Sequence, residues 1–142
     1  MGKREMKIAL DTNLLIYFLE GIEPQAGKVE KLLESFMKNE NEGILSTVSV
    51  AEVLTGFYEA GEMARAAKTV SLFKDLTLNS FKIIPVTFEI ADLSANLKAK
   101  IGGKLPDAII VATALDQKAD IIYTEDKDFK RFSHEIKTCN LP

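Results

Sequence analysis

Four acidic residues in this chain stand where a folded α/β protein gathers its chemistry. Asp11 directly follows a short apolar run, and Asp126 lies two residues past another. Glu52 and Asp107 fall in the first turns of predicted helices. The carboxyl ends of parallel strands and the amino ends of the following helices meet at one edge of an open sheet. We therefore expect the four carboxylates to converge.

Such a convergence has a chemical consequence. Like charges a few ångströms apart raise one another's pKa or destabilise the fold, unless a cation lies between them. Hard divalent ions such as Mg²⁺ prefer oxygen ligands and keep several waters, which a carboxylate cluster at an open edge supplies. An ion held in this way activates water and neutralises charge on phosphorus, so phosphodiester hydrolysis needs no nucleophilic side chain.

Each acid also has a purely structural interpretation. For Asp11 alone, capping of the next helix explains the residue equally well. For Glu52 alone, a favourable interaction with the helix dipole is the simpler explanation, and Thr47 or Ser49 is the expected cap of its helix. Asp107 is harder to explain as a cap, because Pro106 prefers the first helical position and leaves Leu105 as the cap residue. The four acids together favour a site.

Short apolar runs alternate with segments of helical periodicity along the whole chain. The predicted strands are 7–10, 44–47, 81–86 and 121–124, with a short fifth around 135–139. Residues 41–43 are predicted to form a turn before the second strand. The predicted helices are 13–19, 26–37, 50–57, 63–76, 88–100 and 107–115. Helix 107–115 is apolar nearly all round, so we expect it to be buried.

Strands this short, separated by helices, imply crossover connections and a parallel sheet. The predicted fold class is therefore α/β, a three-layer sandwich with a short parallel sheet flanked by helices. The length of 142 residues suits a single domain spanning 1–142.

Composition narrows the class of protein. With 46% hydrophobic and 27% charged residues, the chain is typical of a soluble globular protein. No apolar run approaches the roughly 20 residues of a membrane span. The first residues lack the apolar core of a secretory signal. Cys139 is the single cysteine, which excludes an internal disulfide and a cysteine metal cage. We expect a cytoplasmic protein with no membrane association.

The net charge of −3 and the pI of about 5.3 count mildly against a nucleic-acid substrate. The objection weakens if several acids hold a cation, because the bound ion reverses the local field. Lys104 lies close in sequence to Asp107, so we predict that it contacts a substrate phosphate.

The blocks around the four acids resemble the PIN-domain family of nucleases. Residues 8–13 are similar to the opening strand of that family with its first metal acid, and residues 49–54 to the helix with the second. Residues 105–114 resemble the third block, the most specific of the set, and residues 123–129 resemble the fourth. Four blocks in the family's order cover nearly the whole chain.

This resemblance implies a PIN-like fold and an endoribonuclease that depends on Mg²⁺ or Mn²⁺. The implied catalytic residues, which are also the metal ligands, are Asp11, Glu52, Asp107 and Asp126. The residues implied to orient them or to lie beside them are Thr12, Asn13, Thr124 and Asp128. The compact length is similar to the VapC-type toxins of toxin–antitoxin pairs, which implies an RNA substrate, a cognate antitoxin and a homodimer.

Other functions would require different residues or leave the same residues without a catalytic role. A stand-alone PIN-domain nuclease for RNA processing and a non-catalytic RNA- or protein-binding module on the same fold stay open. An aspartyl-nucleophile phosphatase needs a second acid two residues after Asp11, where Asn13 stands. A phosphorylated receiver domain needs an acid after the third strand, where the chain has Pro85-Val86-Thr87.

The remaining chemically capable residues have structural explanations. His134 lies near the tail, away from any predicted strand end, and we expect it on the surface. Cys139 is predicted to be a small packing residue. Five phenylalanines at core-like spacing are predicted to be buried: Phe36, Phe57, Phe73, Phe81 and Phe88.

Overall fold

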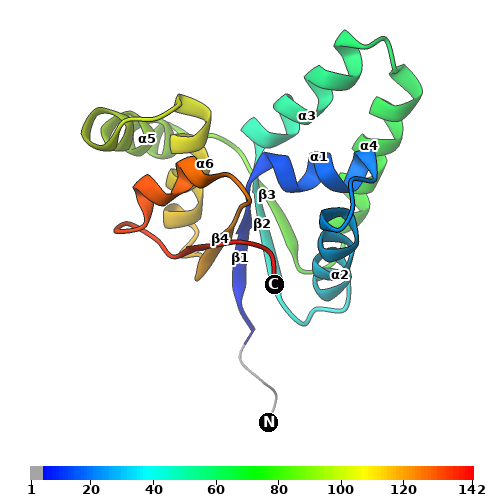
Figure 1. Ribbon diagram of the computed structural model, residues 1–142, viewed down its shortest axis with the longest axis horizontal. Helices are drawn as coiled ribbons and strands as arrows, with labels where there is room; N and C mark the ends of the chain where they lie inside the picture. The colour runs from blue at the N-terminus through cyan, green and yellow to red at the C-terminus, as the bar shows by residue number, and fades with distance from the viewer. Residues whose placement is uncertain (1–4) are drawn as a thin grey trace.

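The computed structural model describes residues 5–142, and a five-stranded sheet runs through its centre (Figure 1). The strands are β1 (Lys7–Leu10), β2 (Glu42–Ser46), β3 (Phe81–Ile84), β4 (Ile121–Tyr123) and β5 (Thr138–Cys139). Their spatial order is β3-β2-β1-β4-β5, and every neighbouring pair is parallel.

Helices cover both faces of this sheet. On one side lie α1 (Thr12–Glu20), α2 (Gln25–Met37), α3 (Thr47–Glu59) and α4 (Met63–Leu76) (Figure 1). On the other side lie α5 (Phe88–Ile101), α6 (Leu105–Asp116) and the 3₁₀ helix η1 (Lys127–Phe132). The predicted three-layer α/β sandwich is therefore confirmed.

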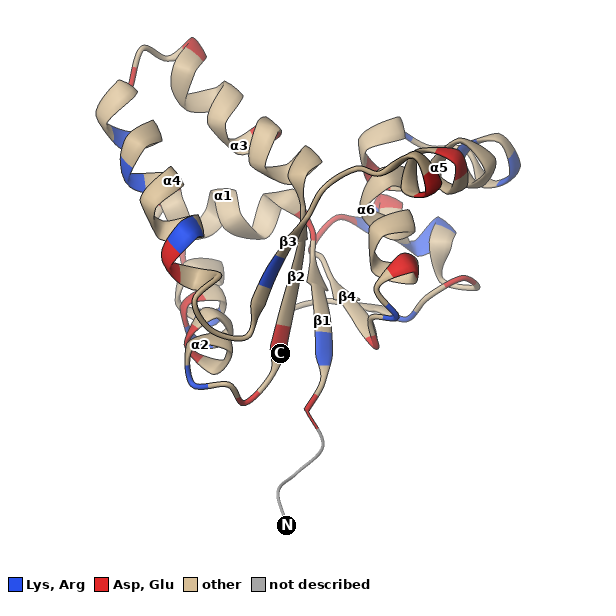
Figure 2. Cartoon of the chain, turned by 180° about the vertical axis from the view of Figure 1, so that it is seen from behind, with Lys and Arg blue, Asp and Glu red and all other residues tan. Residues whose placement is uncertain are grey.

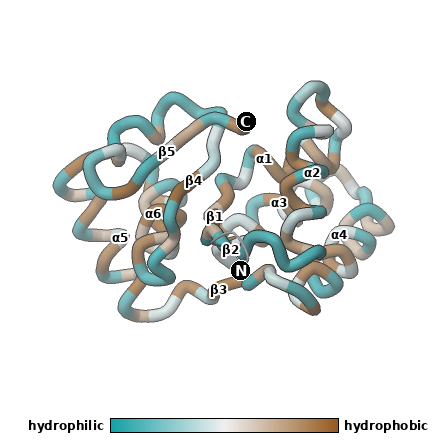
Figure 3. Tube along the Cα trace, turned by 90° about the horizontal axis from the view of Figure 1, so that it is seen from below, coloured by the Kyte–Doolittle hydropathy of each residue, from teal (hydrophilic) through white to brown (hydrophobic). Residues whose placement is uncertain are grey.

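Two hydrophobic cores lie on opposite faces of the sheet. Successive side chains of a strand point to opposite faces, and β1 shows this directly. Ile8 and Leu10 pack into the core shared with α1–α4, whereas Ala9 packs into the core shared with α5, α6 and η1. Seen from below, apolar segments run along the strands, with hydrophilic segments in the outer loops (Figure 3). As predicted, α6 is largely buried.

The strand order reverses at β1. The chain proceeds from β1 to β2 and β3 on one side, then returns to place β4 and β5 on the other. In open α/β sheets, the crevice beyond the strand carboxyl ends at such a reversal is the usual ligand site. The residues that follow β1 and β4, Asp11 and Thr124, stand at this crevice.

The second strand begins earlier than predicted. Glu42 and Gly43 were expected in a turn, but they pair with Lys7 and Ile8 of β1. Gly43 is required here because two rings press against its backbone. A Cβ atom added to it would lie 2.5 Å from Phe81 Cδ1 and 2.6 Å from Phe36 Cε2. The glycine therefore marks a close approach within a strand, not a turn.

Two further predictions near the third strand need correction. β3 ends at Ile84, before Pro85, because proline cannot donate to the ladder. Phe88 was expected in the core, but it is the first residue of α5 and is 84% exposed. The other four predicted core phenylalanines are buried. No helix within residues 5–142 is both long and apolar enough to cross a lipid bilayer.

Candidate active site

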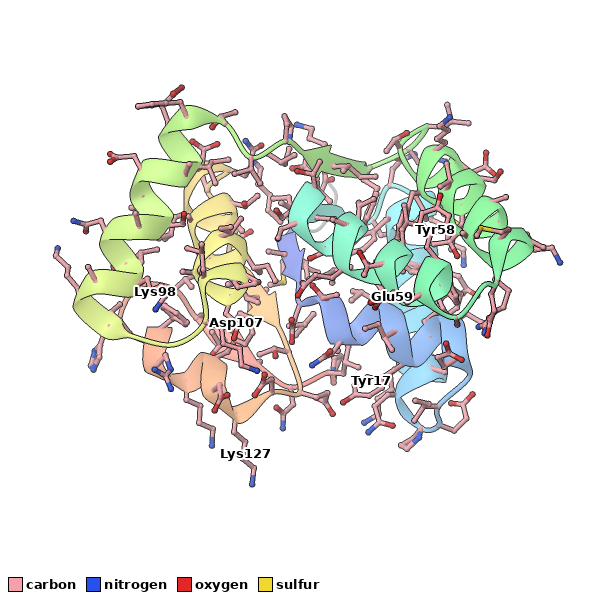
Figure 4. The ribbon with its side chains drawn as sticks, turned by 90° about the horizontal axis from the view of Figure 1, so that it is seen from above. Tyr17, Tyr58, Glu59, Lys98, Asp107 and Lys127 are labelled. Atoms are coloured by element: carbon pink, nitrogen blue, oxygen red, sulfur yellow. The ribbon has the colours of Figure 1, made fainter. Side chains whose placement is uncertain are left out.

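A cavity of about 300 Å³ opens at the carboxyl edge of the sheet, between α1, α3 and α6. It is lined by Asp11, Thr12, Asn13, Ile16, Glu52, Lys104, Pro106, Asp107 and Asp126. All four predicted acids thus line one cavity, although they come from four separate segments of the chain. Viewed from above, Asp107 lies near the middle of this edge, where α6 meets the segment leading to η1 (Figure 4).

Asp11 is the most deeply buried of the four acids. It stands at the N-cap position of α1, but its side chain makes no capping hydrogen bond. Instead, Asp11 Oδ2 accepts a hydrogen bond of 2.8 Å from Thr124 Oγ1. The backbone supports this pairing, because Asp11 N–H donates to the carbonyl of Tyr123 at 3.2 Å. Only 3% of the Asp11 surface is exposed, and β1 and β4 together hold this residue in place.

Glu52 is held by the hydroxyl of Thr12, which also contacts the hydroxyl of Ser49. Thr12 Oγ1 donates to Glu52 Oε1 at 2.7 Å and lies 2.7 Å from Ser49 Oγ. Ser49 is fully buried, one helical turn before Glu52 on α3. Sequence reasoning considered Ser49 only as a helix cap. The signal for its position was available, since a serine three residues before an acid shares a helix face with it.

The starts of two helices differ from prediction. The cap of α3 is Ser46, whose hydroxyl accepts from Val48 N–H at 3.1 Å, and not Thr47 or Ser49. The cap position of α6 is Lys104, so Pro106 stands second and not first in the helix. Asp107 is therefore the third residue of α6, within its first turn, where the helix dipole favours a negative charge.

Asp126 is tied to the same threonine as Asp11. Its backbone N–H donates to Thr124 Oγ1 at 3.0 Å, and its carboxylate accepts from Asp128 N–H at 2.9 Å. Thr124 thus joins the two acids that follow β1 and β4. Asp128 itself is exposed and does not line the cavity.

The electrostatics of the cavity follow from this crowding. Burial, assisted by the carboxylates of Asp107 and Asp126, raises the pKa of Asp11 from 3.8 to about 6, against the lowering effect of the Thr124 hydroxyl. Burial and the Asp126 carboxylate also raise the pKa of Asp107, which the Lys104 ammonium opposes. The cavity therefore resists the full negative charge of its own acids, and a cation bound among them would relieve that repulsion.

The donor atoms suit a hard divalent cation. The lining offers carboxylate, hydroxyl and amide oxygens, with no histidine or cysteine. Among residues 5–142, no three histidine, cysteine, aspartate or glutamate side chains are already placed to hold an ion together. Glu52 is exposed, and Asp107 and Asp126 are half-buried. These three carboxylates are therefore more accessible to an ion from solvent than that of Asp11, which is buried.

The remaining residues that the sequence singled out differ in whether they line the cavity. Lys104 and Asn13 line the cavity. His134 is exposed, as predicted, and lies outside the cavity lining. Cys139 is partly buried against the core, which confirms its packing role. Ile16, which no chemical motif would have indicated, supplies an apolar wall.

The model of the PIN-domain family matches residues 8–135, a span that includes all four acids of the cavity. The chain belongs to the PIN-domain family. It is also 32% identical over 139 residues to Ribonuclease VapC2 of Methanocaldococcus jannaschii, with 89% of each chain covered.

Solved structures of other proteins share the fold. A chain of a toxin–antitoxin complex from Klebsiella pneumoniae superposes with a TM-score of 0.68 at 25% identity, covering 95% of this chain and 98% of that one. A chain of DNA-bound VapBC from Salmonella typhimurium gives a TM-score of 0.73 at 14% identity, covering 96% and 99%. At 14% identity the second likeness concerns the fold alone.

Proposed function

We propose that this PIN-domain protein is an endoribonuclease that depends on Mg²⁺ or Mn²⁺ and hydrolyses RNA phosphodiester bonds. The observation that carries the proposal is the convergence of Asp11, Glu52, Asp107 and Asp126 on one cavity. Relatedness to a protein named as a ribonuclease supports RNA as the substrate class. The proposed unit is a single nuclease domain spanning residues 1–142.

In this proposal the four carboxylates hold the ion and form the catalytic centre. The bound ion would supply an activated water and charge neutralisation at phosphorus. Thr124 engages Asp11 Oδ2 and Thr12 engages Glu52 Oε1. These hydroxyls therefore fix the orientation of each carboxylate and leave its second oxygen available, the usual role of groups that support metal ligands.

Lys104 is the proposed phosphate contact of the cavity. Its ammonium acts on the Asp107 carboxylate, and its backbone occupies the cap position of α6. A flexible cationic side chain beside a helix N-terminus suits the binding of a phosphate oxygen. Asn13 lines the same cavity and supplies a neutral hydrogen-bonding group. We assign Asp128 a supporting role, because its N–H donates to the Asp126 carboxylate.

The biological setting we propose is the toxin of a toxin–antitoxin pair. Its partners would be the RNA substrate, a cognate antitoxin protein and a second copy of the chain in a homodimer, all in the cytoplasm. The likeness to a chain of the Klebsiella pneumoniae toxin–antitoxin complex supports the antitoxin partner. The alternative is a stand-alone RNA-processing nuclease, and growth of a host that expresses the chain distinguishes it from a toxin.

The decisive test is cleavage of total RNA by the purified chain with Mg²⁺, with Mn²⁺ and with EDTA. Asp11→Asn and Asp107→Asn should abolish cleavage, and EDTA should abolish it in the unsubstituted protein. Asp116→Asn is the matched control, because it makes the same chemical change at an exposed position at the far end of α6. Undiminished cleavage by both cavity variants would end the nuclease assignment.

Growth of a bacterial host after induced expression distinguishes a toxin from a processing enzyme. A toxin should arrest growth, and Asp11→Asn should relieve the arrest. Co-expression of a small protein encoded beside the gene should restore growth if it is the antitoxin. Normal growth with active, RNA-cleaving protein would favour the processing alternative.

A further inference from the structure

Two more cavities adjoin the catalytic cavity, each at a different part of its lining. The first, here called the η1 groove, has a volume of about 300 Å³ and shares Asp126 with the catalytic cavity. The second, here called the α1–α3 groove, has a volume of about 160 Å³ and shares Ile16 and Glu52. A polymer that enters the catalytic cavity and extends beyond it thus has two open directions.

The η1 groove presents two exposed lysines. Lys127 and Lys130 line it, and both are exposed. They are three residues apart on a 3₁₀ helix, a spacing that places both side chains on the same side. Within residues 5–142, neither forms an ion pair with a carboxylate. Figure 4 shows Lys127 extending from the η1 segment on the Asp107 side of the molecule.

The carboxylates of the η1 groove already accept hydrogen bonds from backbone N–H groups. Glu125 accepts a hydrogen bond of 3.0 Å from Leu141 N–H, and Asp126 accepts one of 2.9 Å from Asp128 N–H. Thr138 and Asn140 complete the lining with neutral polar groups. The groove therefore combines exposed ammonium groups with carboxylates whose charge is partly satisfied by backbone N–H groups.

The α1–α3 groove has the opposite character. It is lined by three acids, Glu20, Glu52 and Glu62, and by no lysine or arginine. The nearest cation, Arg65, forms ion pairs of 3.3 Å with Glu20 and 2.9 Å with Glu62. Neither α1 nor α3 carries a lysine or arginine, as the absence of blue on α3 shows (Figure 2).

We infer that a single-stranded RNA leaves the catalytic cavity across Asp126 into the η1 groove, where Lys127 and Lys130 hold its backbone phosphates. Phosphate affinity comes from neutralisation by Lys and Arg, and a chain of net charge −3 has no general attraction for a polyanion. The path of the RNA is therefore set by the difference in charge between the two grooves, because lysines line the η1 groove and glutamates line the α1–α3 groove. This inference rests on the proposed function, and it adds the path of the substrate.

The test is binding of a fluorescein-labelled 12-nucleotide single-stranded RNA, followed by anisotropy between 50 and 200 mM salt. All proteins are full-length and carry Asp11→Asn to prevent cleavage. Each phosphate contact to a single strand contributes about −0.7 to the slope of log affinity against log salt. Lys127→Gln with Lys130→Gln should therefore flatten the slope by about 1.4 and raise Kd about tenfold at 100 mM salt.

The matched control is Lys28→Gln with Lys31→Gln on α2. These lysines are exposed, have the same three-residue spacing and change the net charge equally, but they lie outside both grooves. This pair should leave the slope unchanged. Lys127→Arg with Lys130→Arg keeps the charge and should retain the original slope. Equal slopes for the two glutamine pairs, or no RNA binding by the parent chain, would overturn the inference.

Cleavage by the unsubstituted protein, measured separately, keeps the two proposals distinguishable. If no RNA is cut but the two glutamine pairs differ in slope, the groove binds RNA and the nuclease assignment fails. If RNA is cut but the slopes agree, the nuclease assignment stands and the strand takes another path.

Discussion

The hydroxyl of Thr124 donates a hydrogen bond of 2.8 Å to the Asp11 carboxylate, although 113 residues separate the two in the chain. The pairing of β1 with β4 creates this contact, because it brings the carboxyl ends of both strands together. The same hydroxyl accepts from Asp126 N–H. One side chain at the reversal of strand order therefore orients two of the four acids in the cavity.

Thr124→Val should impair the site without removing any acid. Valine has the shape of threonine but donates no hydrogen bond, so Asp11 Oδ2 would lose its partner. Loss of a group that orients a metal ligand typically costs 10- to 100-fold in metal affinity or activity. We expect the Mg²⁺ concentration for half-maximal RNA cleavage to rise by about that factor. Thr124→Ser keeps the hydroxyl and should retain most activity; equal impairment of both variants would argue against the hydrogen bond as the cause.

Asp11 should make the metal-free protein less stable as pH rises. Its pKa is about 6 when folded, above the ordinary value of 3.8. Below pH 3.8 the carboxyl is protonated in both states and costs no stability. As pH rises towards 6 the unfolded chain ionises first, so stability falls until the folded group has also ionised. The full shift corresponds to about 3 kcal/mol, because one pKa unit is worth about 1.4 kcal/mol.

Urea unfolding in EDTA at several pH values between 4 and 8 measures this effect. Asp11→Asn should be more stable than the unsubstituted chain at pH 8, and the difference should shrink at pH 4. The Asp116→Asn control should follow the unsubstituted protein throughout. A constant difference between Asp11→Asn and the unsubstituted chain at all pH values would contradict the raised pKa.

Divalent ions should stabilise the folded chain, because an ion held by the cavity binds the native state and not the unfolded one. At 100 times the dissociation constant, one such site contributes about 2.7 kcal/mol. We expect Mg²⁺ or Mn²⁺ to raise Tm in the unsubstituted protein and to raise it much less in Asp11→Asn or Glu52→Gln. Sodium chloride at equal ionic strength is the control. Equal rises in Tm with and without the cavity acids would place the bound ion elsewhere.

Gly43→Ala should be strongly destabilising, because the new Cβ atom would overlap the rings of Phe36 and Phe81. Overpacking of this kind typically costs about 1–3 kcal/mol. Gly56→Ala is the matched control, since an added Cβ at Gly56 in α3 meets nothing within 4 Å. Alanine in a helix interior is favoured over glycine by about 1 kcal/mol, so this variant should gain stability. Urea midpoints measure both changes, and similar losses in the two variants would disprove the close-approach explanation.

Much of the fold followed from local patterns in the sequence. Short apolar runs separated by helical periodicity are sufficient to predict a parallel sheet with helices on both faces, because parallel strands need crossover connections. The apolar segment that became α6 was predicted to be buried for the same kind of reason. Errors concentrated at element ends, such as the starts of β2 and α6, where one residue's backbone state depends on contacts from distant segments.

The convergence of the acids was also predictable, since each stands at a strand carboxyl end or a helix amino end. The sequence by itself determined the acids, their places on the elements and the shared sheet edge. Only the tertiary structure decided which groups hold them: Thr124 holds Asp11, and Thr12, which itself contacts Ser49, holds Glu52. Tertiary structure also placed Phe88 on the surface. It brought two lysines into the η1 groove and three glutamates into the α1–α3 groove. These contacts join residues far apart in the chain, and no local periodicity encodes a distance across the sheet.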